Sequence, residues 1–214
     1  MENLIHLGII PDGNRRWSRE NGMGIDQLLE KIFKMVFRFF EDPKSRSEME
    51  CFKYVKEIST YVLTKDNLIK RKDQTLEMIR SGLGIINENM DLFKEMKIQF
   101  IGELDLLPLE LKTLCDSIES KSNQESTLKL TVGIAYDPLH DLERLINKDP
   151  SRPEQGKIDM IIRTGGEMRS SGFFPMHTMY SEWFYLDKFF PDLTIADINR
   201  CIQEFQKRNR RFGQ

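Results

Sequence analysis

Apolar positions along the chain alternate between short continuous runs and longer stretches with helical spacing. Residues 4–10 form an apolar run that stops at a Pro-Asp-Gly-Asn turn, which predicts a strand followed by a loop. In residues 25–40 the apolar side chains recur every three or four positions, as they do on one face of a helix. The chain therefore opens with a strand, a loop and a helix.

The same alternation continues along the rest of the chain. We predict further strands over 57–63, 97–101, 128–135, 159–163 and 183–186. We predict helices over 71–96, 109–119, 139–147 and 195–208, and loops over 43–50 and 149–157. Strands that alternate with helices favour a parallel sheet with helices on both faces. The predicted fold class is α/β, with residues 1–214 forming a single domain.

Composition and charge narrow the class of protein. With 39% apolar residues, a chain of 214 residues can bury one good core. A net charge of −2 argues against broad nucleic-acid binding. The sequence has no run of 18 apolar residues and no charged segment followed by an apolar one at its start. We therefore expect a cytoplasmic protein without a transmembrane segment, and its three scattered cysteines fit reduced thiols.

The loop after the first strand, Pro11-Asp12-Gly13-Asn14-Arg15-Arg16-Trp17, is the first candidate site. Glycine lets the backbone approach a ligand, and neighbouring arginines carry forked donors that match phosphate oxygens. An aspartate in such a loop repels phosphate unless a cation bridges them, so Asp12 is predicted to hold Mg²⁺ beside a diphosphate. The alternative is an ordinary Asp-Gly turn with solvated arginines.

The segment 163–172, after the strand predicted over 159–163, is the second candidate site. It contains two arginines, two serines and three glycines, which again describes a cradle for an oxyanion. Parallel strands bring both loops to the carboxyl edge of the sheet, where ligands bind in such folds. Two cradles would suit two diphosphates, whereas the alternative is a glycine-rich surface turn. Glu182, an acid in an apolar stretch, is expected to have a partner or a metal ion.

Residues 6–17 and 161–182 resemble the first and last signatures of the cis-prenyltransferase (undecaprenyl diphosphate synthase) family. The first reads His-Leu-Gly-Ile-Ile-Pro-Asp-Gly-Asn-Arg-Arg-Trp, and the last begins Ile-Ile-Arg-Thr-Gly-Gly-Glu-Met-Arg-Ser-Ser and closes on Tyr-Ser-Glu. Residues 210–213 are similar to the terminal Arg-x-Gly of the family, so the resemblance covers nearly the whole chain. It implies the cis-prenyltransferase fold with an enclosed apolar tunnel, isoprenoid diphosphate substrates and Mg²⁺ as cofactor.

The resemblance also implies roles for single residues. Asp12 and Glu182 match the acids associated with Mg²⁺, and Asp12 and Asn67 are the candidate catalytic residues, Asn67 by helping a proton to leave. The candidate substrate-binding residues are Gly13, Asn14, Arg15, Arg16, Trp17, Thr64, Lys70, Arg163, Arg169, Ser170, Ser171 and Arg211. Members of the family are homodimers whose terminal Arg-x-Gly reaches the partner's active site, so we expect a homodimer. Peripheral membrane contact is expected only if the product is long.

The helix after the first loop departs from chain-elongating members of the family. Their Arg and His, with glycines, fall here on Ile25, Leu29, Leu28 and Ile32. The combination of Pro-Asp-Gly-x-Arg-Arg-Trp-Ser at 11–18 with Arg-Ser-Ser-Gly-Phe-Phe-Pro at 169–175 is similar to the lavandulyl-type branch, which couples two dimethylallyl diphosphates irregularly. The main hypothesis is therefore prenyl transfer from a dimethylallyl or short-chain allylic diphosphate to a second isoprenoid diphosphate, including irregular non-head-to-tail coupling.

Two alternatives stay open beside this hypothesis. One is regular cis head-to-tail elongation with isopentenyl diphosphate. The other, from a different class, is a non-catalytic lipid-binding partner subunit, although the Asp-Gly-Asn loop and the acid at Glu182 that such subunits have generally lost are present.

Three further features are less specific. The helix 71–96 carries apolar side chains that could wall a tunnel, at Leu76, Ile79, Leu83, Ile86 and Met90, with plain core packing as the alternative. Asp137 and Asp141 flank His140, but the following Pro138 favours capping of a helix over a metal site. His6 is expected to be a structural residue.

Overall fold

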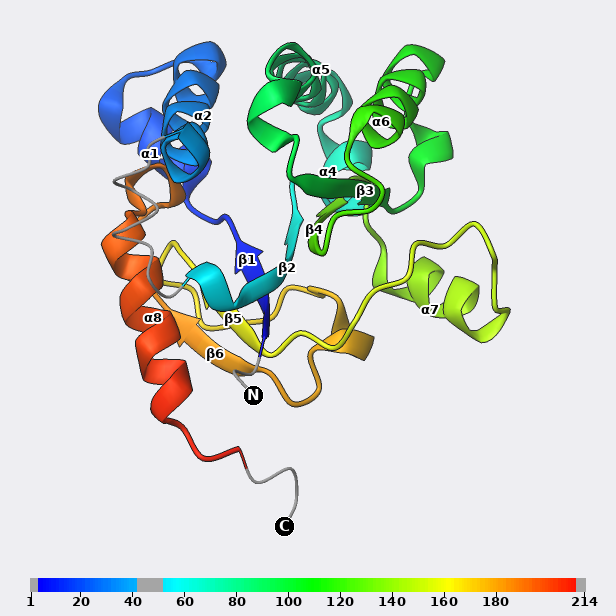
Figure 1. Ribbon diagram of the computed structural model, residues 1–214. Coiled ribbons are helices and arrows are strands. Elements are labelled where there is room, and N and C mark those ends of the chain that lie inside the picture. The colour runs from blue at the N-terminus through cyan, green and yellow to red at the C-terminus, as the bar shows by residue number, and fades with distance from the viewer. Residues whose placement is uncertain (1–3, 42–51, 211–214) are drawn as a thin grey trace.

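The computed structural model describes residues 4–41 and 52–210 (Figure 1). The loop predicted over 43–50 and the candidate residue Arg211 lie outside these ranges. Within them, no helix is long and apolar enough to cross a membrane.

In the described residues, six parallel strands form one sheet in the order β3-β4-β2-β1-β5-β6 (Figure 1). The strands are β1 (Ile5–Ile10), β2 (Val55–Tyr61), β3 (Met96–Ile101), β4 (Leu128–Gly133), β5 (Met160–Arg163) and β6 (Glu182–Tyr185). The order changes direction at β1, because β2 pairs with one side of this strand and β5 with the other. Crevices at such switch points are where open parallel sheets bind ligands.

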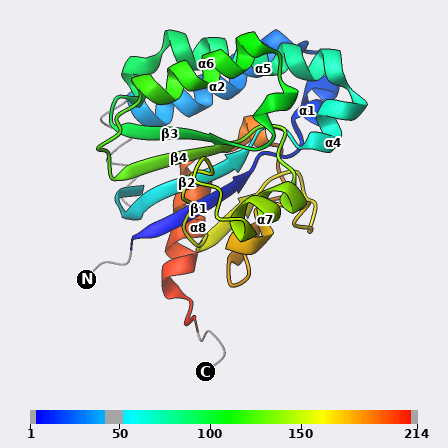
Figure 2. The same cartoon turned by 90° about the vertical axis from the view of Figure 1, so that its right-hand side faces the viewer.

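Helices cover both faces of this sheet, as Figure 2 shows. Three of them lie side by side on one face: α2 (Ile25–Glu41), α5 (Lys72–Glu88) and α6 (Leu109–Lys121). The other face carries α8 (Ile195–Lys207), which starts with a capping box formed by Thr194 and Asp197. Shorter helices follow β1, β2 and β4: α1 (Asn14–Asn21), α4 (Lys65–Lys70) and α7 (Pro138–Ile146). The predicted α/β class with a helix-covered parallel sheet is confirmed.

The main core includes side chains from the sheet, α5, α6 and α8. Ile79 and Leu83 of α5 are buried in it, and Leu76, Ile86 and Met90 pack against it while partly buried. Core packing therefore accounts for side chains that could have walled a tunnel, and the enclosed tunnel stays a prediction. A smaller cluster includes Phe173 and Phe174, which belong to the segment that follows β5.

The helix predicted over 71–96 is shorter than expected. It ends at Glu88, after which the Asn89 side chain donates a hydrogen bond of 2.8 Å to the Ile85 carbonyl. A tight turn over Met90–Phe93 then reverses the chain into β3. The apolar spacing continued through the turn because its side chains also face the core, so periodicity alone could not place the helix end.

The helices α1 and α4 begin in segments that the sequence analysis did not assign to helix. Gly13 starts α1 with φ +95°, a left-handed conformation that suits glycine. The hydroxyl of Thr64 caps α4 by accepting a hydrogen bond of 3.4 Å from the Asn67 amide. Asp137 likewise caps α7, so its predicted capping role is confirmed.

Candidate active site

A cavity of about 800 Å³ opens at the carboxyl ends of β1, β2 and β5. Its walls are the loop after β1, the helix α4 after β2, parts of α2 and α5, and the loop after β5. The predicted site residues that line it are Asp12, Gly13, Asn14, Arg15, Arg16, Thr64, Asn67, Lys70, Arg163, Arg169 and Ser171. Three segments that are far apart in the sequence therefore converge on one space, as the parallel sheet predicted.

The loop after β1 packs closely against Phe189. A Cβ atom added to Gly13 would lie 2.4 Å from the Phe189 ring and 3.1 Å from its backbone, so only glycine fits. The side-chain amide of Asn14 donates to the Pro11 carbonyl at 2.9 Å, which closes the turn. Since no side chain caps the start of α1, the amides of its first turn and the helix dipole favour an anion at this edge of the cavity.

Arg163 joins the first loop to the second. Its side chain is only 3% exposed, and one terminal nitrogen donates to Asp12 Oδ2 at 2.7 Å. The other donates to Ser171 Oγ at 2.9 Å and to the Arg169 carbonyl. The Thr164 hydroxyl adds a hydrogen bond of 2.8 Å to the Asp12 carbonyl. The two predicted cradles are thus held together as one unit.

The carboxylate of Asp12 is held in its ionised form. Burial alone would raise its pKa, but hydrogen bonds from Arg163 and the Gly13 amide, with the charges of Arg163 and Arg16, outweigh burial and lower the pKa below its usual value. The Gly13 amide lies 2.6 Å from Asp12 Oδ1. An ionised carboxylate at a cavity wall is the type of oxygen ligand that Mg²⁺ prefers. Within the described residues no cluster of three or more His, Cys, Asp or Glu forms a ready metal site, so a metal ion here would need oxygens from substrate and water.

The α2 wall of the cavity is apolar, including Ile25, where chain-elongating relatives were expected to have an arginine. Ile25 and Leu28 both line the cavity, and Leu28 is buried. Leu63 and Met78 add further apolar surface nearby. The cavity thus combines charged loops on one side with a hydrocarbon-compatible wall on the other.

Several predicted residues lie elsewhere or have other contacts. Trp17 is buried within the packing of α1 and is not among the residues that line the cavity, and Ser170 is likewise absent from its lining. Lys70 reaches the cavity but is exposed and pairs with Asp66 at 2.9 Å. Tyr61 and Arg71 also line the cavity, although neither was predicted from the sequence.

The structure does not bring Glu182 to Asp12 within this chain. Glu182 begins β6 at the amino edge of the sheet, opposite Met160, whereas Asp12 follows the carboxyl end of β1. Its carboxylate pairs with Arg208 at 2.6 Å. The predicted metal site shared by Asp12 and Glu182 therefore does not form inside a single chain, because the two acids flank opposite ends of parallel strands.

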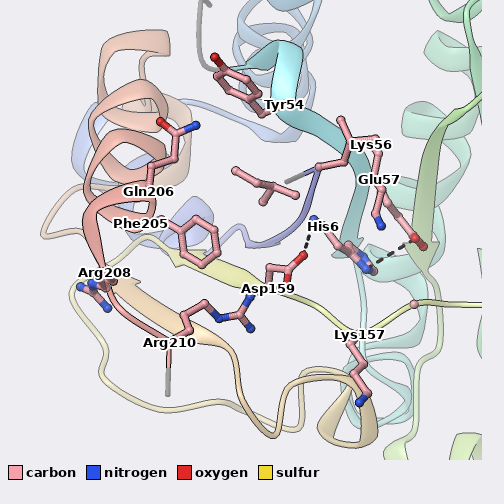
Figure 3. A pocket seen from close by; sticks show the side chains of 13 residues that line it. His6, Tyr54, Lys56, Glu57, Lys157, Asp159, Phe205, Gln206, Arg208 and Arg210 are labelled. Atoms are coloured by element: carbon pink, nitrogen blue, oxygen red, sulfur yellow. Dashed lines mark hydrogen bonds and ion pairs between the residues drawn. The ribbon is translucent and has the colours of Figure 1, made fainter. Parts of the chain in front are cut away.

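A second cavity, of about 870 Å³, lies at the amino ends of β1 and β2 beside the end of α8 (Figure 3). Two of its charged groups pair with each other: Arg210 donates to one oxygen of Asp159 at 2.7 Å, and the His6 amide donates to the other at 2.9 Å. The His6 ring contacts Ser59 Oγ at 2.8 Å, and burial lowers the pKa of His6 to about 3. His6 is structural, as predicted, and the cavity at the carboxyl edge is the candidate active site.

Comparisons with known proteins agree with this geometry. The model of a family described as putative undecaprenyl diphosphate synthase matches residues 10–213. The chain is 31% identical over 242 residues to a tritrans,polycis-undecaprenyl-diphosphate synthase (GGDP specific) of Sulfolobus acidocaldarius, covering 97% of this chain and 87% of that protein. It is 30% identical over 239 residues to the geranylgeranyl-diphosphate-specific enzyme of Sulfurisphaera tokodaii, with the same coverage of 97% and 87%.

Two solved structures share the fold. A probable undecaprenyl diphosphate synthase from Campylobacter jejuni superposes with a TM-score of 0.76 at 22% identity, over 100% of both chains. Lavandulyl diphosphate synthase from Lavandula x intermedia, in complex with dimethylallyl diphosphate, superposes with a TM-score of 0.74 at 20% identity, over 98% of both chains. At these identities the likeness extends to the fold alone.

Proposed function

Because the chain belongs to the undecaprenyl diphosphate synthase family and is an isoprenyl diphosphate synthase, we propose that it elongates an allylic diphosphate in cis with isopentenyl diphosphate. The observation that carries the proposal is the single cavity in which Asp12, the two arginine-bearing loops and Asn67 meet. The two archaeal relatives at 30% and 31% identity are named as undecaprenyl diphosphate synthases, whereas the lavandulyl synthase is similar at 20%. Regular elongation, the alternative in the sequence analysis, therefore replaces irregular coupling as the main hypothesis.

The charges of the cavity fit the chemistry of such a step. The allylic C–O bond breaks as negative charge develops on the leaving diphosphate, and Arg15, Arg16 and the first-turn amides of α1 would stabilise that charge. Mg²⁺, if bound by Asp12 and substrate oxygens, would neutralise further charge on the same group. Arg169 and Ser171 would hold the second diphosphate so that its double bond faces the allylic carbon. The electrons of this double bond form the new C–C bond to the allylic carbon, and loss of a proton restores a double bond. Asn67 is the proposed residue that assists departure of the proton.

A homodimer is part of the proposal. Glu182 lies at the amino edge of its own sheet, on the side away from Asp12. If Glu182 contributes to a metal site at Asp12, a second copy of the chain must supply it. Sedimentation velocity of the purified protein tests the assembly, and a monomer at micromolar concentration would remove Glu182 from the proposed metal site.

One observation keeps irregular coupling as a second candidate. The Arg and His positions on α2 that carry polar contacts to the allylic diphosphate in chain-elongating members are Ile25 and Leu29 here, and Ile25 forms part of the cavity wall. A wall of this kind gives the allylic diphosphate fewer polar contacts than regular elongation normally uses. Such a change suits a donor that binds in a different orientation.

Product analysis by mass separates the candidates. The purified protein with Mg²⁺ is incubated with geranylgeranyl diphosphate and isopentenyl diphosphate together, and with dimethylallyl diphosphate alone. We expect a product only when isopentenyl diphosphate is present. A product from dimethylallyl diphosphate alone would support irregular coupling, and no product from any pair would support a non-catalytic subunit.

The substitution Asp12→Asn tests the metal-site assignment. It keeps the shape and an acceptor for the Gly13 amide but removes the charge, so we expect kcat to fall roughly 10²-fold or more. Asp105→Asn is the matched control, because Asp105 is exposed and pairs with surface Lys112. Turnover of Asp12→Asn at the level of this control would refute the assignment.

A further inference from the structure

Most of the cations that line the candidate cavity already lie beside a carboxylate. Arg163 pairs with Asp12 at 2.7 Å, and Arg169 pairs with Glu167 at 2.7 Å. Arg16 lies 3.5 Å from Asp12 and 3.7 Å from Glu167. Much of the positive charge of the two loops is therefore offset by the protein's own acids, and a diphosphate needs further cations.

Lys70 and Arg71 line the same cavity as neighbours in the chain, but their surroundings differ. The Lys70 side chain is 66% exposed and pairs with Asp66 at 2.9 Å. Arg71 is half-buried, and among residues 4–41 and 52–210 it pairs with no carboxylate. Of the cavity cations in these ranges, this holds otherwise only for Arg15, on the loop after β1. All donors of the Arg71 guanidinium are therefore available to an anion in the cavity.

The backbone holds Arg71 at a fixed joint between two helices. Since α4 ends at Lys70 and α5 starts at Lys72, Arg71 is the one residue between them, with φ −147° and ψ 49°. Its amide donates to the Asn67 carbonyl, and its carbonyl accepts from the Thr75 amide, both at 3.1 Å. Thr75 is buried, and its hydroxyl donates to the same Asn67 carbonyl at 3.5 Å. The base of the Arg71 side chain is thus fixed relative to Asn67, the residue proposed to assist proton departure.

The face of α5 that follows Arg71 changes from polar to apolar. Gln74 and Met78 follow at helical spacing and also line the cavity, with Met78 two turns beyond Arg71. The helix α2, whose Ile25 and Leu28 give the cavity an apolar wall, packs against α5. An allylic diphosphate has a charged head and a hydrocarbon tail. The order along α5 matches this polarity when the diphosphate lies at Arg71.

We propose that Arg71 is a substrate-binding residue, which donates to the diphosphate of the allylic substrate from the joint between α4 and α5. It supplies a cation from this wall, whereas α2 has Ile25 at the position of an expected arginine. A guanidinium makes two parallel hydrogen bonds to phosphate oxygens, which an ammonium group cannot do. The inference rests on the proposed function, because it assigns Arg71 to the allylic substrate of that reaction.

Arg71→Met tests the proposal, because it removes the guanidinium and keeps most of the length of the side chain. The ligand is geranylgeranyl S-thiolodiphosphate with Mg²⁺, in which sulfur replaces the bridging oxygen and slows departure of the diphosphate. Calorimetric titration then measures binding without turnover. We expect roughly 10-fold or greater loss of affinity, since hydrogen bonds between charged groups are the stronger ones. The affinity for isopentenyl diphosphate should stay within about 2-fold of wild type.

Turnover with geranylgeranyl diphosphate and isopentenyl diphosphate gives a second measurement. Negative charge grows on the leaving diphosphate as the C–O bond breaks, so kcat should fall together with the affinity. Arg71→Lys keeps the charge but not the fork, and it should recover part of both losses. Arg71→Met should melt with wild type, because Arg71 has no ion pair to lose within the described residues.

Arg80→Met is the matched control. It makes the same change of charge on the same helix, but Arg80 is exposed, pairs with Glu110 and is not among the residues that line the cavity. Its affinity for the analogue should equal that of wild type. An equal loss in the two variants would mean general attraction by positive charge and would overturn the proposal.

The remaining outcomes also decide the matter. Wild-type affinity in Arg71→Met, or a larger loss in Lys70→Met than in Arg71→Met, would overturn the proposal. A wild-type protein that does not bind the analogue would overturn it too. If wild type binds the analogue but makes no product from any substrate pair, the proposed function fails, while the comparison with Arg80→Met still decides whether Arg71 binds the diphosphate.

Discussion

A buried ion pair fastens the loop at 149–157 to α7, and its removal should be costly. Arg152 donates to the two oxygens of Asp141 at 2.7 and 3.2 Å, and the Tyr136 hydroxyl donates to the same carboxylate at 3.0 Å. Arg152 also lies 2.9 Å from His177 Nε2. Since arginine only donates, this ring nitrogen must accept, which leaves Nδ1–H to donate to the Gly156 carbonyl at 3.1 Å.

The substitution Arg152→Met would leave a carboxylate in the interior without its cation. The side chains of Asp141 and Arg152 are only 4% and 7% exposed, so water cannot replace the lost partner. Breaking one side of such a pair costs about 3–5 kcal/mol of unfolding free energy. For a domain of this size, that corresponds to a fall in Tm of roughly 6–20 °C.

Equilibrium urea unfolding, followed by circular dichroism, measures this loss. The double variant Asp141→Asn with Arg152→Met should recover much of it, because no buried charge remains and asparagine still accepts from Tyr136. The control Arg80→Met breaks an exposed pair with Glu110 and should cost no more than about 1 kcal/mol. A loss below about 1 kcal/mol in Arg152→Met, or a double variant as unstable as the single one, would refute the reasoning.

Two other features give predictions of stability. His6 has a pKa of about 3 because it is buried, whereas an unfolded histidine titrates near 6.5. As the pH is lowered, the unfolded state therefore takes up the proton first. The free energy of unfolding should fall by about 2 kcal/mol from pH 7 to pH 5. Urea midpoints at both pH values check this, and His6→Gln should flatten the dependence. Gly13→Ala should destabilise the fold by about 2–4 kcal/mol and impair turnover, because residue 13 has a left-handed backbone and the added carbon would clash with Phe189. Gly22→Ala has φ +60° but open space around the added carbon, so it should cost only about 1–2 kcal/mol. Equal losses in the two glycine variants would show that the Phe189 contact is unimportant.

Most of the fold could be predicted because its strands are short apolar runs and its longer helices are amphipathic. The short helices were harder to predict, since α1 starts at a glycine and α4 has only six residues. Their starts depend on local backbone conformation and on one capping hydroxyl at Thr64, which leave little periodic signal.

The placement of the candidate residues could be predicted where charged residues follow strands directly. Asp12 and Arg163 stand at the ends of β1 and β5, so the parallel sheet brings them together at 2.7 Å. Glu182 is the first residue of its strand, and this position already indicates the opposite edge of the sheet. The family resemblance alone suggested a metal site shared with Asp12. Tyr61 was missed as a residue of the cavity wall because a single tyrosine at the end of a strand has no distinguishing pattern.

The central place of β1 has a consequence for synthesis on the ribosome. The His6 amide bonds to Asp159, which is 153 positions later, so β5 cannot pair with β1 until most of the chain has been made. At usual translation rates the delay is on the order of 10 s or more. During that time β3, β4, β2 and β1 can assemble with one edge of β1 unpaired, and such an edge is prone to pair with other chains. The nascent enzyme should therefore be most exposed to aggregation, and most dependent on chaperones, shortly before Arg163 emerges.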